Sequence, residues 1–127
     1  MPVRARMLLT RAFLELIRFD VVSALFGFQA IHGRLKRQRA ARRRSGQPEG
    51  AICRAVETAT CFYWRRVLCL QRAVVTVRML RAHGIPAELV IGCRPAPFLS
   101  HAWVEVDGRV LNGSSAFRQK LLVLERV

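Results

Sequence analysis

The sequence predicts an α+β fold in which helices come first and a small antiparallel sheet follows. Apolar residues recur at three- and four-residue spacing up to about residue 83, the period of helices packed on one side. From residue 88 onward the pattern alternates with a period of two, which is typical of half-buried strands. Asp107-Gly108 is a strong signal for a two-residue turn between antiparallel strands. Helices followed in this order by an antiparallel sheet are typical of the α+β class.

Helices are expected over residues 3–35, 49–64 and 68–83. The first carries one apolar stripe, and Gly27 and Gly33 weaken it locally. Gly84 predicts the end of the third helix, because glycine is favoured in the left-handed position that follows a helix. The buried face of this third helix is expected to comprise Leu70, Ala73, Val74, Val77, Leu80 and the aliphatic stem of Arg81.

Strands are expected over residues 88–93, 100–106 and 109–112, and a fourth over 120–126. The second alternates as His-Ala-Trp-Val-Glu-Val, and Asp107-Gly108 turns it into the third.

Strong positive charge suggests an anionic partner. The 127 residues carry a formal net charge of +14, and seven cations lie within residues 34–44. Acidic peptides, acidic proteins, nucleic acid and anionic membranes all fit this charge. We divide the chain at the Ser45–Pro48 break, into a basic N-terminal helical segment with its linker (residues 1–47) and a catalytic core (residues 48–127).

Several classes of protein fit the sequence poorly. No secretory signal is evident, and the longest apolar stretch, residues 21–31, is too short to span a bilayer, so a reducing cytoplasm is expected. No specific nucleic-acid binding is expected, because aromatic residues do not interleave the arginines. The helix over residues 3–35 either packs on the core or a partner, or lies on an anionic membrane surface. Four cysteines without a Cys-x-x-Cys pair favour neither a metal site nor a cofactor.

Cys69 and His101 are the candidate catalytic residues. Cys69 lies at the expected start of the third helix, where exposed amides and the helix dipole favour a thiolate, and Arg72 adds positive potential. His101 opens the second strand and is placed to accept the thiol proton. Gln71 either helps to hold an oxyanion or is a helix-surface amide. The alternative to this thiol enzyme is a buried cysteine beside an unrelated strand histidine.

Asn112 is the candidate third residue. With a two-residue turn, Val106 pairs with Arg109 and Trp103 pairs with Asn112, which puts Asn112 on the His101 side of the sheet. Glu105 shares that side but lies about 13 Å along the strand from His101 at ~3.3 Å per residue. Asn112 therefore either orients the imidazole or simply ends the hairpin.

From Cys53 onward, the chain resembles the transglutaminase-like leader peptidases of lasso-peptide biosynthesis. The resemblance rests on order, spacing and local identity, carried by residues 69–72 (CLQR), 79–87 (MLRAHGIPA), 91–93 (IGC), 98 (F), 101–106 (HAWVEV) and 108 (G). The basic N-terminal segment is similar to that of the stand-alone peptidase form.

The resemblance implies a papain- or transglutaminase-like core and a thiol protease that removes the leader from a ribosomally made lasso-peptide precursor. It implies Cys69 as nucleophile and His101 as general base, with leader recognition on a separate small protein and ring closure by a separate ATP-dependent cyclase. The family usually has an acid where Gly113 stands, so Asn112 substitutes, or the pair acts as a dyad, or activity is weakened. A related thiol acyltransferase and a catalytically weakened scaffold protein of the same pathway are the alternatives.

Overall fold

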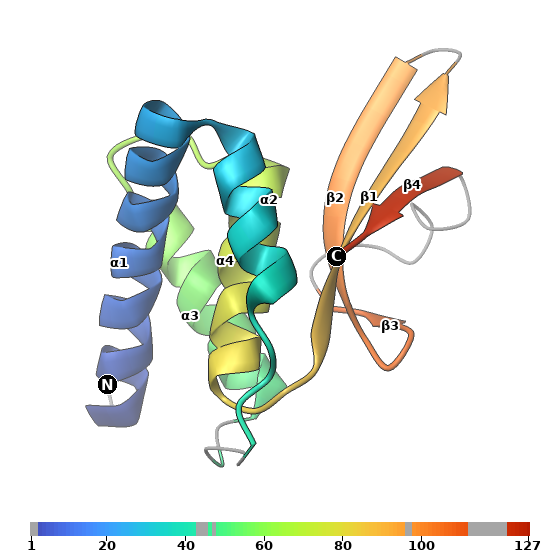
Figure 1. Cartoon of the computed structure of the whole chain (residues 1–127). Helices are drawn as coiled ribbons and strands as arrows, with labels where there is room; N and C mark the ends of the chain where they lie inside the picture. Colours follow the sequence, from blue (N-terminus) through green and yellow to red (C-terminus); the bar gives the residue numbers. More distant parts are fainter. Residues whose placement is uncertain (1–2, 43–45, 47, 96–97, 112–121) are drawn as a thin grey trace.

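Helices and an antiparallel sheet occur in the predicted order in the structure, a computed structural model that describes residues 3–42, 46, 48–95, 98–111 and 122–127. The α+β class is therefore confirmed. In Figure 1 the helices lie on one side and the sheet on the other, with α1 farthest from the sheet. The elements are α1 (Val3–Phe26), α2 (Phe28–Arg37), α3 (Glu49–Phe62), α4 (Cys69–Ala82), β1 (Ala87–Pro95), β2 (Phe98–Val106), β3 (Arg109–Val110) and β4 (Leu122–Arg126).

The expected single helix over residues 3–35 is wrong, because the chain breaks at Gly27 into α1 and α2. Gly27 has φ 79° and ψ 172°, a conformation that essentially only glycine adopts at low cost. Its N–H still donates to the Ser23 carbonyl and closes α1, while its own carbonyl accepts from Ala30 in α2. The chain turns back at this point, and α2 runs in the opposite direction beside α1 (Figure 1).

The expected end of α4 is confirmed by its C-terminal cap. Gly84 has φ 84°, and its N–H donates to the Arg81 carbonyl. The N–H of Ile85 donates to the Leu80 carbonyl at 2.9 Å, which completes a Schellman motif. This cap ends the helix and directs the chain into β1.

One core is shared by the two parts into which we divided the chain. Leu16 of α1 and Leu35 of α2 belong to the same buried cluster as Leu80 of α4 and Val104 of β2. The division near residue 48 stays a prediction, but the N-terminal helices do pack on the core, as the first of the two alternatives expected. Among the described residues, no helix combines the length and apolar character needed to cross a bilayer.

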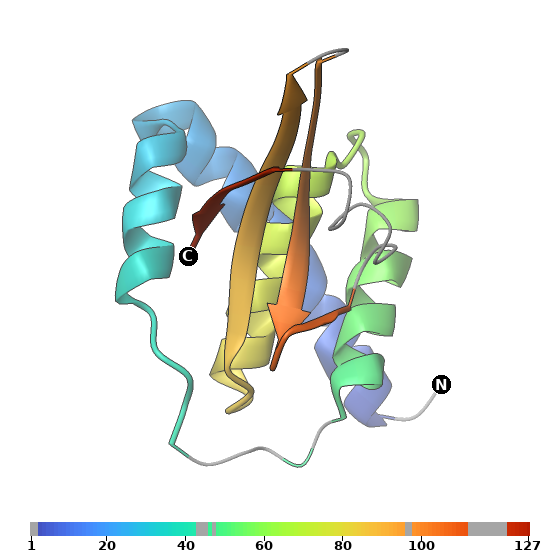
Figure 2. The ribbon, with the colours of Figure 1, turned by 90° about the vertical axis from the view of Figure 1, so that its right-hand side faces the viewer.

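The sheet has the order β3-β2-β1-β4, and Figure 2 shows it in front of the helices. Val106 pairs with Arg109, as expected, and Asp107 (φ 51°) and Gly108 (φ 77°) form the turn. The expected hairpin register is therefore confirmed in the described pairs. β3 comprises only Arg109–Val110, so it ends before the expected residue 112.

The two faces of β2 have different surroundings. Ala102, Val104 and Val106 belong to the main core cluster, together with residues of the helices. Trp103, which is 1% exposed, belongs to a separate buried cluster with Val90 of β1. Since side chains alternate along a strand, the Trp103 face is the one that also carries His101 and Glu105.

Candidate active site

Cys69 is the first residue of α4, as the sequence predicted. The preceding residue, Leu68, is in extended conformation and gives the helix no side-chain cap, and the first turn holds no acidic residue. No side-chain carboxylate or hydroxyl at the cap position therefore accepts a hydrogen bond from the first main-chain N–H groups of α4. The partly buried thiol of Cys69 therefore lies beside main-chain donors that no side chain of the cap occupies.

His101 lies in β2 opposite Gly92 of β1. Its half-buried ring stacks with Trp103, with ring centroids 6.1 Å apart and planes inclined by 21°. Burial lowers the pKa of His101 below its usual value of 6.5, and the positive charge of Arg72 lowers it further. The imidazole is therefore in its neutral, proton-accepting form near neutral pH.

The fold brings Cys69 and His101 to the same end of the molecule. From Cys69, α4 runs about 20 Å to its C-terminus, at ~1.5 Å per residue. From Val106, which pairs with the first residue of β1, β2 runs back about 17 Å to His101, at ~3.3 Å per residue. α4 packs against β2, and Arg72, one turn after Cys69, lies close enough to repel a charge on His101. Alternation directs the imidazole to the Trp103 face of the strand rather than to the Val104 face.

Asn112 lies outside the described residues, so its role as third catalytic residue stays a prediction. The ladder that would carry it is in place as far as Leu111, whose N–H donates to the Val104 carbonyl at 2.9 Å. Gly113 also lies outside the described residues.

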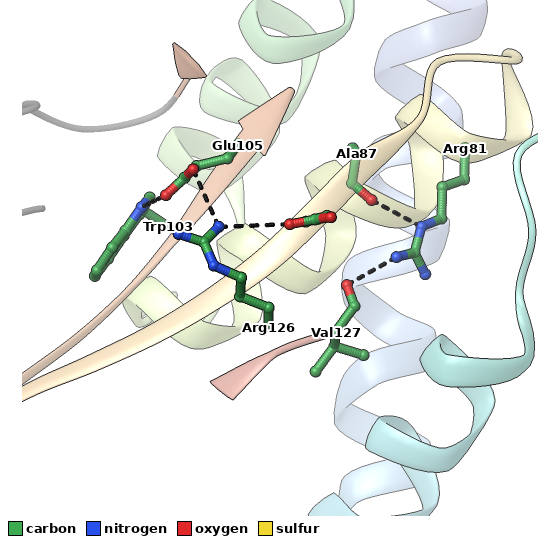
Figure 3. A network of polar contacts seen from close by, with 7 residues as sticks. Arg81, Ala87, Trp103, Glu105, Arg126 and Val127 are labelled. Atoms are coloured by element: carbon green, nitrogen blue, oxygen red, sulfur yellow. Dashed lines mark hydrogen bonds and ion pairs between the residues drawn. The ribbon is translucent and has the colours of Figure 1, made fainter. Parts of the chain in front are cut away.

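A polar chain on the His101 face was not foreseen. Trp103 donates from Nε1 to Glu105 at 2.8 Å, and Arg126 of β4 donates to the other oxygen of the same carboxylate at 3.2 Å (Figure 3). Glu105 is only 2% exposed. The sequence argument excluded a direct contact of Glu105 with His101 and did not consider that the indole between them links the two.

Gln71 fits neither of the roles expected for it, because it is a buried tether between α4 and α1. Its side-chain amide donates to the Leu16 carbonyl at 3.2 Å and to Asp20 at 3.3 Å. The hydroxyl of Tyr63 donates to the other oxygen of Asp20. Burial first, and then Asp20, raise the pKa of Tyr63 to about 12. This cluster fixes the first turn of α4, which bears the thiol, against α1.

A cavity of about 370 Å³ opens beside the start of α4. Leu68 and Leu70, the two neighbours of Cys69, form part of its wall, and the guanidinium-bearing side chains of Arg65 and Arg66 line it as well. Apolar walls with a few polar groups are typical of sites that take a small molecule or a side chain. The rest of its lining is Phe19, Asp20, Ser23, Ala24, Phe28 and Gln71.

The other thiols have different environments. None of the four cysteines is joined in a disulfide. Burial, followed by the charges of Glu49 and Glu57, raises the pKa of Cys53, which makes it a poor nucleophile. Cys61 is exposed near the end of α3 and not at a helix start. Among the described residues, no group of three His, Cys, Asp or Glu side chains is placed to hold a metal ion.

Comparison with known proteins supports the resemblance seen in the sequence. A stretch of 59 residues is 44% identical to the Microcin J25-processing protein McjB of Escherichia coli. That stretch is 46% of this chain and 28% of the relative, so most of the relative's length has no counterpart in the match. No solved structure matches the chain. The family described as the transglutaminase-like superfamily matches over residues 13–126, nearly the whole sequence, and the chain belongs to that superfamily.

Proposed function

We propose that this protein is a cysteine peptidase that removes the leader from a ribosomally made lasso-peptide precursor. The observation that carries the proposal is Cys69 at the uncapped start of α4, with His101 on β2, the strand that packs against this helix. The similarity to a microcin-processing protein supports this choice of substrate class.

In the proposed reaction, His101 takes the proton from Cys69, whose sulfur attacks the carbonyl carbon of the scissile peptide bond. Main-chain N–H groups at the start of α4 face the oxyanion that develops. His101 then protonates the leaving amine, which frees the core peptide and leaves the leader as a thioester on Cys69. Water, deprotonated by His101, hydrolyses this thioester and restores the thiol.

The remaining parts of the proposal concern orientation and partners. Asn112 is the candidate that orients His101, in place of the acid that the family usually has at the position of Gly113. A separate leader-recognition protein and an ATP-dependent cyclase are the expected partners, and the expected compartment is the cytoplasm. The cationic residues 34–44 are candidates to dock on an acidic face of either partner.

The test is mass spectrometry of a leader-bearing precursor incubated with this protein and its cognate recognition protein. We expect a leader-sized fragment with the wild type, none with Cys69→Ala, and an unchanged yield with Cys93→Ala, the matched control. A fragment that gains the mass of water indicates hydrolysis, whereas one joined to an added amine indicates an acyltransferase.

An intact precursor in every lane, with the recognition protein shown to bind the leader, would contradict the peptidase and favour a scaffold protein. Alkylation rates give a second readout, because an activated thiolate reacts faster than an ordinary thiol. The other three cysteines, of which Cys61 is exposed and Cys53 and Cys93 are partly buried like Cys69, must first be replaced by serine, so that the rate reports on Cys69.

A further inference from the structure

Helix α1 has a second apolar surface on the side opposite to the core. Its buried side contributes Leu8, Ala12, Leu16 and Val22 to the protein interior. On the other side, large apolar residues are between 44 and 71% exposed. They are Val3, Met7, Leu14, Ile17, Val21 and Leu25. In Figure 1, α1 forms the outermost layer of the helices, and no described element covers its far side.

These residues follow a heptad rather than a broad apolar face. Met7, Leu14 and Val21 are seven apart, and Val3, Thr10 and Ile17 form a second seven-residue series between them. Successive residues of a helix are about 100° apart around its axis, so the six residues of these two series lie within about 80° of the helix circumference. This is the width of the narrow apolar seam of a coiled coil. The Thr10 hydroxyl donates to the Arg6 carbonyl, so it brings no unpaired polar group to this surface. We call these six residues the outer seam.

One border of the outer seam is cationic. Arg4, Arg11 and Arg18 are also seven apart, directly beside the apolar residues. The two acidic residues of α1 offset them only in part, since Glu15 is near Arg18 but is shared with α4. Glu15 is paired with Arg78 of α4 at 2.8 Å, and Asp20 is held in the Tyr63–Gln71 cluster. A partner helix would therefore meet net positive charge along this border.

The charge and width of the seam distinguish between occupants. If two copies packed seam to seam, Arg4, Arg11 and Arg18 would face the same arginines of the other copy in an antiparallel pair, or Arg6 and Phe13 in a parallel pair. They would meet no carboxylate in either case. A helix that lies on a lipid surface needs a broad apolar face and a polar opposite face, whereas the opposite face of α1 is core. We propose that the outer seam docks an amphipathic helix of a partner protein whose apolar heptad is bordered by Asp or Glu.

The test uses the full chain and a fluorescent synthetic helix about four heptads long, with Leu and Ile at the seam and Glu at the bordering positions. A matched peptide has Lys in place of Glu. We expect the Glu peptide to bind at least ~10-fold more tightly by fluorescence anisotropy, and to weaken as salt rises. Ile17→Gln or Leu14→Gln should each lower its affinity about tenfold, since each removes one buried side chain from the complex.

Two variants sharpen the result. Replacing Arg4, Arg11 and Arg18 together by Glu should reverse the preference in favour of the Lys peptide. Phe62→Gln, at an exposed apolar residue on α3, is the matched control and should change nothing. Circular dichroism confirms that each variant remains folded. Because the readout is binding, it does not depend on the proposed peptidase activity.

Three results would overturn the proposal. Equal binding of both peptides, or binding that Ile17→Gln and Leu14→Gln leave unchanged, would show that the outer seam is not a docking surface. Seam-dependent binding to phosphatidylglycerol vesicles without a preference for the Glu peptide would assign the surface to a membrane. A dimer in light scattering that Ile17→Gln abolishes would assign it to a second copy of this chain.

Discussion

Replacing the buried Arg81 by Met should destabilise the fold without changing the chemistry at Cys69. The guanidinium donates to the carbonyls of Ala87 at 3.0 Å, Leu35 at 2.6 Å and Gln38 at 3.3 Å, and to the main-chain oxygen of Val127 at 2.8 Å. Figure 3 shows two of these contacts. Arg81 thus joins the end of α4 to α2, β1 and the residue after β4.

The magnitude follows from the carbonyls left behind. Met fills the space of the aliphatic stem but donates no hydrogen bond. The carbonyls of Ala87 and Leu35 are buried, and each unsatisfied buried group costs about 1–3 kcal/mol. The variant should therefore lose about 3 kcal/mol or more of its free energy of unfolding. At roughly 4 °C per kcal/mol for a chain of this size, Tm should fall by about 12 °C.

Urea unfolding followed by circular dichroism measures this loss. Arg37→Met, at an exposed arginine on the last turn of α2, is the matched control and should change the free energy by less than about 0.5 kcal/mol. Arg81→Lys should fall between Arg81→Met and the wild type, because an ammonium group cannot reach four acceptors as a planar guanidinium does.

The reasoning would be refuted if Arg81→Met unfolded within about 0.5 kcal/mol of the wild type, since the four contacts would then have no net value. It would also fail if the folded variant lost alkylation at Cys69. Arg81 lies about 18 Å along α4 from Cys69, at ~1.5 Å per residue, so its loss should leave the thiol environment intact.

Three further outcomes follow from the same structure. Arg72→Gln should raise the pKa of His101 toward its usual value while burial still holds it lower, which NMR titration of the imidazole checks; a further decrease would contradict the assigned cause. Tyr63 is the chain's one tyrosine, so tyrosinate absorbance should appear only at about pH 12 in the native protein and at about pH 10 in urea; a native transition near 10 would disprove its burial against a carboxylate. Gly27→Ala should lower the free energy of unfolding in urea by about 1–3 kcal/mol, because Gly27 has a positive φ. Gly50→Ala in α3 should be neutral or stabilising by up to about 1 kcal/mol, because the added Cβ meets only an arginine side-chain end at 3.6 Å. Similar effects of the two substitutions would refute the strain at Gly27.

The parts of the fold that were predicted correctly depend on local signals. Gly84 ends α4 because its conformation is decided within a few residues, and Asp107-Gly108 turns β2 into β3 for the same reason. Gly27 is a local signal too. A glycine destabilises a helix by only about 1 kcal/mol, however, so the sequence predicted a weakened helix at this point and not a break. Only the tertiary packing of α2 beside α1 decides between the two readings.

In the candidate site, too, local sequence signals were sufficient for some residues and not for others. Cys69 and His101 stand in short motifs, so the sequence alone singled them out. The hydrogen-bond partners of Gln71, Glu105 and Arg81 were not foreseen because they are distant in sequence: Gln71 bonds to α1, Glu105 to β4, and Arg81 to α2 and the residue after β4. A sequence pattern shows that such a side chain is polar, but not which buried acceptor the folded chain brings to it.

The two ends of α4 are held in different ways. At the C-terminal end, the Schellman motif and Arg81 satisfy main-chain groups from several elements. At the N-terminal end, no side chain caps the first amides, and the helix is held instead through Gln71, which leaves the main-chain donors beside Cys69 uncommitted to a cap. A capping Ser or Asp in place of Leu68 would be expected to stabilise α4 by about 1 kcal/mol. It would also occupy the donors that the proposed oxyanion needs, so stability and activity should change in opposite directions in Leu68→Asp, as urea unfolding and precursor cleavage measured on the same variant would show.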